Sequence, residues 1–138
     1  KPFLNAIRFN ENKSKYIMAA REIFSKGTNL RLKDFLNSFK DQFELREWLV
    51  ENVKGFGYKE ASHFLRNIGM GNELAILDTH ILKNLKRYEV IADIPKSLSK
   101  KTYMDIETKM RSFAEKIDVP FDELDLLLWA EETGFIFK

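Results

Sequence analysis

The chain has 138 residues, with 44% hydrophobic and 32% charged side chains, a composition typical of one globular domain over residues 1–138 rather than of a disordered segment. It contains no cysteine and only two histidines, which excludes disulfide frameworks, thiolate zinc sites and cysteine-ligated iron–sulfur clusters and disfavours a histidine-rich metal site. The formal net charge of +2 indicates no particular partner, and no apolar run reaches the roughly 20 residues of a membrane helix.

Helical spacing of apolar residues dominates the N-terminal part of the sequence. It predicts a first helix over residues 16–24, which Gly27 ends. A short second helix follows a cap at Thr28 or Asn29. Asp41 stands three residues before a glutamate, as in a capping box, so we expect it to begin a third helix of about three turns.

Four more helices are predicted in the C-terminal part. The first begins near Lys59, after the Gly55-Phe56-Gly57 break, and ends at Gly69. No strand pattern competes with the helical signal, so the expected fold class is all-α with about seven helices. The starts of the other three helices are assigned to Asp78, Ser99 and Asp122, the last of these after a break at Pro120 and with a stop at Gly134.

A glycine hairpin joins two of the predicted helices at about residues 43–68. Two glycines around one apolar residue permit a sharp turn and let another molecule approach the backbone closely. The first amides of the following helix have no partner inside it and can bind a phosphate oxygen. Between residues 53 and 87 six basic residues stand against three acidic ones, which fits a phosphate-facing surface. The same residues fit equally well an ordinary helix corner with a solvated charged face.

Lys59 and Asp78 are the candidates for catalytic chemistry. Lys59 lies in the first turn of its helix, where a cation opposes the helix dipole. A neutral lysine amine is a nucleophile that can form a Schiff base. Asp78 follows nineteen residues later and is a good helix cap, and in a cleft the same carboxylate can stabilise a developing cation. From composition alone, an exposed lysine and a plain cap are the simpler interpretation.

Several sequence patterns carry a family resemblance. Val53-Lys54-Gly55-Phe56-Gly57-Tyr58-Lys59 followed by Leu77-Asp78-Thr79-His80 is similar to the helix-hairpin-helix and aspartate signature of DNA glycosylases, at the spacing of the lyase-competent branch. Residues 57–67, 94–99 and 123–138 extend the similarity through nearly the whole chain. With them, the chain resembles the type-2 8-oxoguanine DNA glycosylase/AP lyase family of archaea and some bacteria. The resemblance implies a helical domain of the helix-hairpin-helix DNA glycosylase type.

The same resemblance implies a bifunctional enzyme that excises 8-oxoguanine from double-stranded DNA and then nicks the strand. Lys59 would attack C1′ of the flipped nucleotide, form a Schiff base and break the 3′ phosphate bond by β-elimination. Asp78 would stabilise the oxocarbenium-like sugar and help position Lys59. The carboxylate of Lys138 would take part in recognising the oxidised base. Trp129 is a candidate pocket wall by the same comparison, although an aromatic residue at helical spacing is more often core.

DNA contacts and a cation are also implied by the resemblance. Backbone carbonyls of Glu51, Val53 and Phe56 would hold a Na⁺ or K⁺ ion that bridges to a DNA phosphate, and no other cofactor is expected. The protein is expected to be a monomer in the prokaryotic cytoplasm, associated with the nucleoid and not with a membrane. Family members carry further helices before the position of Lys1, so the chain is expected to be the C-terminal two-thirds of such a protein. The DNA contacts are assigned to Val53, Lys54, Gly55, Phe56, Gly57, Tyr58 and His80.

Two other functions stay open at the level of the sequence. One is a non-catalytic helix-hairpin-helix DNA-binding module, which needs neither Lys59 nor Asp78 at this spacing. The other is a glycosylase of the same superfamily for another damaged base, which the residues of the base pocket would decide. The absence of cysteine argues against the iron–sulfur endonuclease-III-like relatives.

Overall fold

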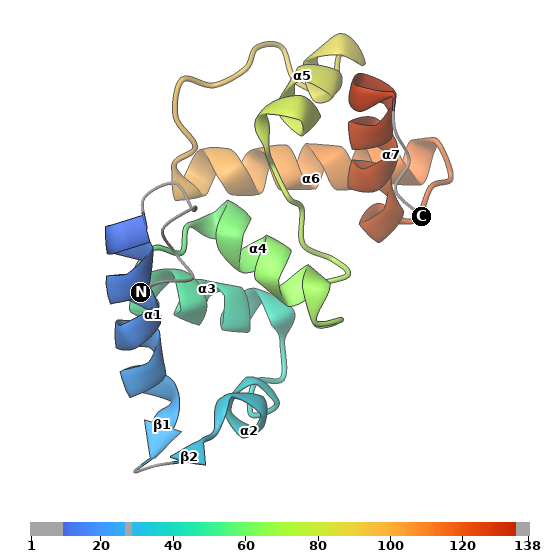
Figure 1. Ribbon diagram of the computed structural model, residues 1–138. Coiled ribbons are helices and arrows are strands. Elements are labelled where there is room, and N and C mark those ends of the chain that lie inside the picture. The colour runs from blue at the N-terminus through green and yellow to red at the C-terminus, as the bar shows by residue number, and fades with distance from the viewer. Residues whose placement is uncertain (1–9, 27–28, 135–138) are drawn as a thin grey trace. The chain divides into compact units, whose positions relative to one another are not determined.

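A computed structural model of the chain describes residues 10–26 and 29–134 (Figure 1). The chain forms two compact units, residues 1–57 and residues 58–138, and each is described by itself. Seven helices and one pair of two-residue strands make up the regular structure of the described residues, which confirms the expected all-α class. None of the described helices is long and apolar enough to cross a membrane. That the two units form a single domain stays a prediction.

The described part of unit 1 starts with a helix and a short hairpin. α1 (Asn10–Phe24) leads into β1 (Ser25–Lys26), which pairs antiparallel with β2 (Asn29–Leu30). Nothing in the sequence indicated this short hairpin, because two-residue strands are too short to leave an alternating pattern. Gly27, predicted to end the first helix, lies outside the described residues.

The second helix, α2 (Leu32–Leu36), starts later than predicted. It follows Arg31, whose side chain makes no capping hydrogen bond. Asn29, one of the two predicted caps, lies in β2 instead, and the other, Thr28, lies outside the described residues. A helix of five residues without a cap is too short to be stable alone, so it depends on packing within unit 1.

An aromatic cluster, Phe24, Phe35, Phe39 and Trp48, supplies that packing. The ring centroids of Phe35 and Trp48 lie 4.5 Å apart, and those of Phe24 and Phe35 lie 5.4 Å apart. Trp48 belongs to α3 (Gln42–Asn52), so the cluster joins the three helices that the structure describes in unit 1. Tilted aromatic pairs of this kind contribute about 0.5–1.5 kcal/mol each beyond the area that they bury.

α3 begins as predicted at Asp41. One carboxylate oxygen of Asp41 accepts the amide of Phe43 at 2.5 Å and that of Glu44 at 3.4 Å. Two amides that have no partner within the helix are thereby satisfied. The capping carboxylate thus fixes where α3 starts, and the helix runs from there for eleven residues into the glycine hairpin.

The hairpin loop, residues 53–57, follows α3. The Phe56 amide donates to the Val53 carbonyl at 3.0 Å and closes a tight turn. Gly55 adopts φ = +93°, and a β-carbon on it would lie 2.5 Å from Cδ2 of Tyr16. Because both the backbone conformation and the close aromatic ring exclude a side chain, this position requires glycine.

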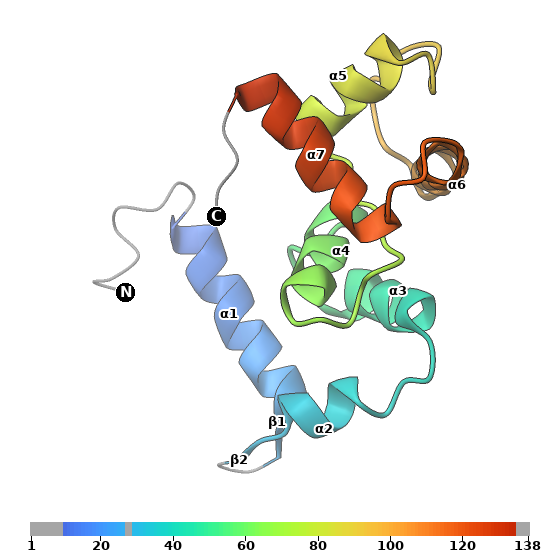
Figure 2. The ribbon, with the colours of Figure 1, turned by 90° about the vertical axis from the view of Figure 1, so that its right-hand side faces the viewer.

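Unit 2 starts with α4 (Tyr58–Asn67), so the predicted order of helix, hairpin and helix is confirmed. α4 ends before Gly69, the predicted stop, which adopts φ = +75°. Three helices follow: α5 (Thr79–Arg87), α6 (Lys100–Lys116) and α7 (Phe121–Thr133). α5 and α7 lie side by side, and α6 contacts α7 (Figure 1 and Figure 2).

Polar caps start two of these helices as predicted. The side chains of Asp78 and Ser99 accept first-turn amides of α5 and α6 at 2.8 and 3.2 Å. The last helix differs, because α7 begins at Phe121, directly behind Pro120, and Asp122 lies inside its first turn. The prediction that Asp122 starts this helix is therefore wrong. The φ of −55° at Pro120 leads into the helix, and the Asp122 carboxylate still lies near the positive end of the helix dipole.

An extended segment, residues 74–78, leads into α5 and runs across α6 (Figure 1). Leu74 and Ala75 are fully buried, and Leu77 is 1% exposed. No neighbouring strand pairs with this segment among the described residues. Side chains of α6 bond to its buried backbone instead, and the segment ends at Asp78.

Candidate active site

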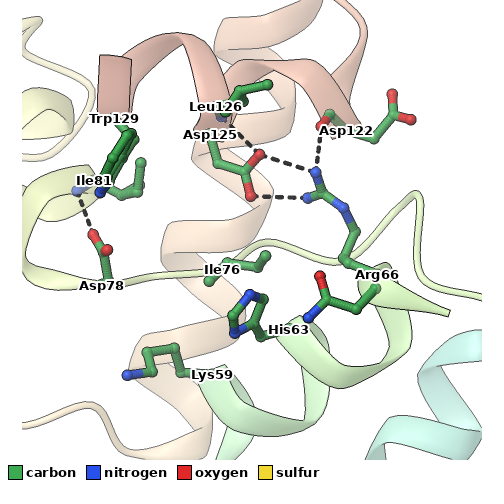
Figure 3. Close-up of a pocket in the computed structure, with 11 residues that line it drawn as sticks. Lys59, His63, Arg66, Ile76, Asp78, Ile81, Asp122, Asp125, Leu126 and Trp129 are labelled. Carbon is green, nitrogen blue, oxygen red and sulfur yellow. Dashed lines mark hydrogen bonds and ion pairs between the residues drawn. The ribbon is translucent and has the colours of Figure 1, made fainter. Parts of the chain in front are cut away.

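A pocket of about 470 Å³ lies within unit 2. Its walls come from α4, from the extended segment before α5, from α5 and from α7 (Figure 3). Lys59, Asp78 and Trp129, three residues predicted to act in catalysis or base recognition, all line it. The polar side chains that line it are Lys59, His63, Arg66, Asn67, Asp78, Asp122 and Asp125.

One face of α4 forms a wall of the pocket. Lys59, His63 and Arg66 follow one another at intervals of four and three residues, which places them along one side of a helix. Lys59 Nζ lies 3.3 Å from Oε1 of Glu60, and the Lys59 side chain is 44% exposed. An exposed ion pair of this kind contributes little to stability, so a bound substrate can displace it at small cost.

Asp78 is held by the start of α5. Its Oδ1 accepts the Ile81 amide at 2.8 Å, so the predicted cap is confirmed. The residue is half-buried and lines the pocket, and Figure 3 shows it at the same end of the pocket as Lys59. The hydrogen bond uses one carboxylate oxygen, and the second is suited to stabilise positive charge that develops in the pocket.

An ion pair between Arg66 and Asp125 joins α4 to α7 at the other end of the pocket (Figure 3). Arg66 Nη1 and Nη2 lie 2.9 and 3.0 Å from the two carboxylate oxygens. The guanidinium also donates to the carbonyls of Leu74 and Asp122. Burial raises the pKa of Asp125 above its usual value of 3.8, and the guanidinium of Arg66 opposes that change. The pair therefore depends on both partners staying in place.

Trp129 lies on α7, one turn beyond Asp125. It is half-buried, lines the pocket and also packs against the core of unit 2. The two interpretations that the sequence left open, pocket wall and core residue, thus both describe its position. Lys138, the other residue assigned to base recognition, lies outside the described residues.

The residues predicted to contact DNA fall into both units. Val53 is buried, whereas Lys54 and Gly55 are exposed in the hairpin loop of unit 1, together with half-buried Phe56 and Gly57. In unit 2 the Tyr58 ring packs against Tyr103, with ring centroids 5.4 Å apart. A DNA contact from Tyr58 would therefore come from its backbone. His80 lies in the first turn of α5 and does not line the pocket.

The carbonyls assigned to a monovalent cation belong to the end of α3 and the loop behind it. The Glu51 carbonyl is among the last four of the helix, which have no partner within it. The Val53 carbonyl accepts the Phe56 amide and has a second lone pair for another ligand. Three oxygens within six residues therefore suit a hard cation. No cluster of three or more histidine and carboxylate side chains for a metal occurs in the part of the chain that the structure describes.

Most residues that line the pocket were not singled out from the sequence, among them His63, Arg66 and Asp125. His63 and Arg66 share a helix face with Lys59, so helical register could have found them. Asp125 is 59 residues away from Arg66 in the chain, and no local pattern links the two. Its signal in the sequence is its place in the stretch 123–138 that carries the family resemblance, one turn before Trp129.

A lysine at the start of the helix behind a glycine hairpin, with a capping aspartate in the same pocket, defines the helix-hairpin-helix class of DNA glycosylases. A sequence profile described as 8-oxoguanine DNA glycosylase matches residues 2–119, and the chain belongs to this family. The 8-oxoguanine DNA glycosylase/AP lyase of Fusobacterium nucleatum is 54% identical over 136 residues, which are 99% of this chain and 63% of the relative. That of Korarchaeum cryptofilum is 44% identical over 95% of this chain and 60% of the relative.

Solved structures agree with this assignment. The Methanocaldococcus jannaschii 8-oxoguanine glycosylase/lyase in complex with 15mer DNA containing 8-oxoguanine is similar with a TM-score of 0.83 and 40% identity, over 95% of this chain and 60% of that one. The 8-oxoguanine DNA glycosylase of Thermotoga maritima gives a TM-score of 0.79 and 39% identity, over 96% of this chain and 60% of that one. The chain thus spans about 60% of the length of these relatives.

Proposed function

We propose that the chain is the catalytic part of a DNA repair enzyme, a bifunctional 8-oxoguanine DNA glycosylase/AP lyase. The observation that carries the proposal is that Lys59 and Asp78, nineteen residues apart in the sequence, line one end of the same pocket. A nucleophile and a carboxylate that face a common space can act on one sugar. Membership of the 8-oxoguanine DNA glycosylase family supports the choice of substrate.

In the proposed reaction the damaged nucleotide leaves the DNA stack and enters the pocket, which costs a few kcal/mol. Lys59 leaves its exposed ion pair with Glu60 and gives up one proton to solvent, and the amine so formed makes a bond to C1′ of the sugar. The bond between C1′ and the base breaks, and the base departs with the electron pair and takes up one proton from solvent. Opening of the sugar ring then gives a protonated Schiff base.

The Schiff base makes the second half of the reaction possible. It acidifies the protons on C2′, so one of them is lost and the 3′ phosphate departs as the leaving group in a β-elimination. Asp78 stabilises the positive charge that develops on the sugar while the base leaves. Trp129 and Lys138 are proposed to recognise the base. The strand is nicked on the 3′ side of the sugar, and water later releases the lysine.

The proposed partner is double-stranded DNA containing 8-oxoguanine. The loop amides and Lys54 of the hairpin, with Tyr58 through its backbone and His80, would contact the DNA, so affinity should fall steeply with salt. A Na⁺ or K⁺ ion on the hairpin carbonyls would add a contact with a phosphate. Because the substrate is DNA and the relatives are bacterial and archaeal, we expect a monomeric enzyme in the cytoplasm at the nucleoid.

Borohydride trapping tests the proposal. Duplex DNA with one 8-oxoguanine is incubated with the chain, with Lys59→Ala and with the matched control Lys109→Ala, which removes a lysine from an exposed ion pair on α6. We expect a covalent protein–DNA adduct with the chain and with the control and none with Lys59→Ala. The series is repeated with the chain joined to the part of the Fusobacterium relative that it does not match, because the chain spans 63% of that relative.

Each alternative function predicts a different gel. An adduct that persists in Lys59→Ala would refute the assignment of the nucleophile. A duplex with an ordinary guanine, or with another damaged base, that is processed better than 8-oxoguanine would favour a glycosylase of different base specificity. Absence of an adduct in both series, with DNA binding intact, would favour the non-catalytic DNA-binding module.

A further inference from the structure

The extended segment before Asp78 makes three of its backbone hydrogen bonds with side chains of α6. The Ala75 amide donates to Oε2 of Glu107 at 2.7 Å, and the Tyr103 hydroxyl donates to the Ala75 carbonyl at 2.7 Å. The Leu77 amide approaches the same hydroxyl at 3.4 Å. All three contacts are buried, where an unsatisfied backbone group is costly. Tyr103 and Glu107 thus fix the path of the chain into Asp78.

Tyr103 also contacts the start of α4. Its ring lies 5.4 Å from that of Tyr58, centroid to centroid, at an interplanar angle of 35°. Tyr58 directly precedes Lys59 in the sequence. Tyr103 is 1% exposed, so the packing around it leaves it little freedom to move. The ring of Tyr103 therefore contacts Tyr58, the neighbour of the proposed nucleophile Lys59. The hydroxyl of the same rigid side chain bonds the segment that ends at Asp78.

We infer that Tyr103, together with Glu107, is a positioning residue that sets the distance between Lys59 and Asp78. The inference rests on the proposed function, since it concerns the geometry of that reaction. Packing alone would be served by an apolar side chain, as it is at Met110 on the same helix. A hydroxyl at this depth is needed because the carbonyl of Ala75 and the amide of Leu77 have to be bonded. The segment thus held supplies Ile76 and Asp78 to the pocket.

Tyr103→Phe tests the inference, because it keeps the ring against Tyr58 and removes only the hydroxyl. A displacement of about 1 Å in a catalytic group can lower a rate by about 100-fold, so we expect single-turnover adduct formation to fall by about 10- to 100-fold. The matched control is Tyr88→Phe, which removes an exposed hydroxyl at the end of α5 that bonds Glu131 of α7 at 2.5 Å. The control should keep the rate of the unchanged chain within about twofold.

A double mutant separates positioning from a general loss of stability. If Tyr103 acts through Asp78, Tyr103→Phe should lower the rate by no more than about twofold in a protein that already carries Asp78→Asn. Glu107 gives a second, independent pair of variants. Glu107→Gln keeps an oxygen that accepts the Ala75 amide and should retain the rate, whereas Glu107→Leu removes it and should lower the rate about as much as Tyr103→Phe.

Three results would overturn the inference. The first is an unchanged rate in Tyr103→Phe while the unchanged chain forms its adduct. The second is an equal fold-loss with and without Asp78→Asn, which would mark Tyr103 as a purely structural residue. The third, decisive if Tyr103→Phe does not fold, is equal rates in Glu107→Gln and Glu107→Leu. Failure of the proposed function looks different, because then the unchanged chain itself forms no adduct.

Discussion

Replacing Arg66 by glutamine should make the stability of the protein depend strongly on pH. In the structure the guanidinium bonds both oxygens of Asp125, and the two side chains are only 14% and 8% exposed. Removing one partner of a buried ion pair costs about 3–5 kcal/mol, because the other charge stays buried without compensation. Arg66→Gln should therefore lower the free energy of unfolding at pH 7 by about that amount.

The pH dependence follows from the direction in which the pKa of Asp125 moves. Burial already raises this pKa above 3.8, and loss of the guanidinium removes a contribution that lowers it. A carboxyl group whose pKa is higher in the folded state binds its proton more tightly when folded, so its contribution to stability is full below the unfolded pKa. That contribution is lost as the pH rises from the unfolded pKa through the folded pKa. Its total size is about 1.4 kcal/mol for each pH unit by which the folded pKa exceeds the unfolded one. The variant should consequently recover stability toward pH 4.

Urea unfolding between pH 4 and pH 8 measures this effect. The series compares the unchanged chain with Arg66→Gln and with the double variant Arg66→Gln/Asp125→Asn, which removes the buried charge. Arg87→Gln is the matched control, since Arg87 pairs with Glu131 at an exposed site and should cost less than about 1 kcal/mol. We expect the double variant to regain most of the loss at pH 7. An Arg66→Gln deficit that is equal at every pH, or that Asp125→Asn leaves unchanged, would contradict this reasoning.

Substitutions at two further positions separate stability from chemistry. Asp78→Asn should keep the helix cap and lose most of the trapped adduct. Asp78→Ala should also lose the cap, which lowers the free energy of unfolding in urea titrations by about 1 kcal/mol. A normal rate of adduct formation in Asp78→Asn would contradict the proposed role of the carboxylate. Gly55→Ala should destabilise the chain by about 1–3 kcal/mol, because φ is +93° and the new methyl group meets Tyr16, and DNA affinity measured by fluorescence anisotropy should fall with it. Surface substitutions usually change stability by no more than about 0.5 kcal/mol. A change of that size or smaller in Gly55→Ala would contradict the expected loss of stability.

Local signals predicted much of the fold. Asp41, Asp78 and Ser99 each mark a helix start that the structure confirms, because a short polar side chain can satisfy first-turn amides whatever the rest of the chain does. Gly134 ends α7 in the left-handed conformation, as predicted. The error at Asp122 is of the same local kind, since proline can itself lead into a helix.

The parts that the sequence did not predict depend on contacts between distant residues. The bonds of Glu107 and Tyr103 to the segment before Asp78 span 26 to 32 residues, and the pair of Arg66 with Asp125 spans 59. Neither leaves a periodic or compositional pattern. Lys59 and Asp78 were found because they belong to a recognised motif and not because their residue types alone indicated catalysis.

The aromatic residues give the chain a built-in optical readout. It has two tryptophans, and each unit holds one: Trp48 packs in the aromatic cluster of unit 1, and Trp129 lines the pocket of unit 2. Replacing either by phenylalanine leaves an emission signal from the other unit alone. Coincident urea transitions of the two single-tryptophan proteins would mean that the units melt cooperatively as one domain. Quenching confined to Trp129 on addition of damaged DNA would report the arrival of a base in the pocket in real time.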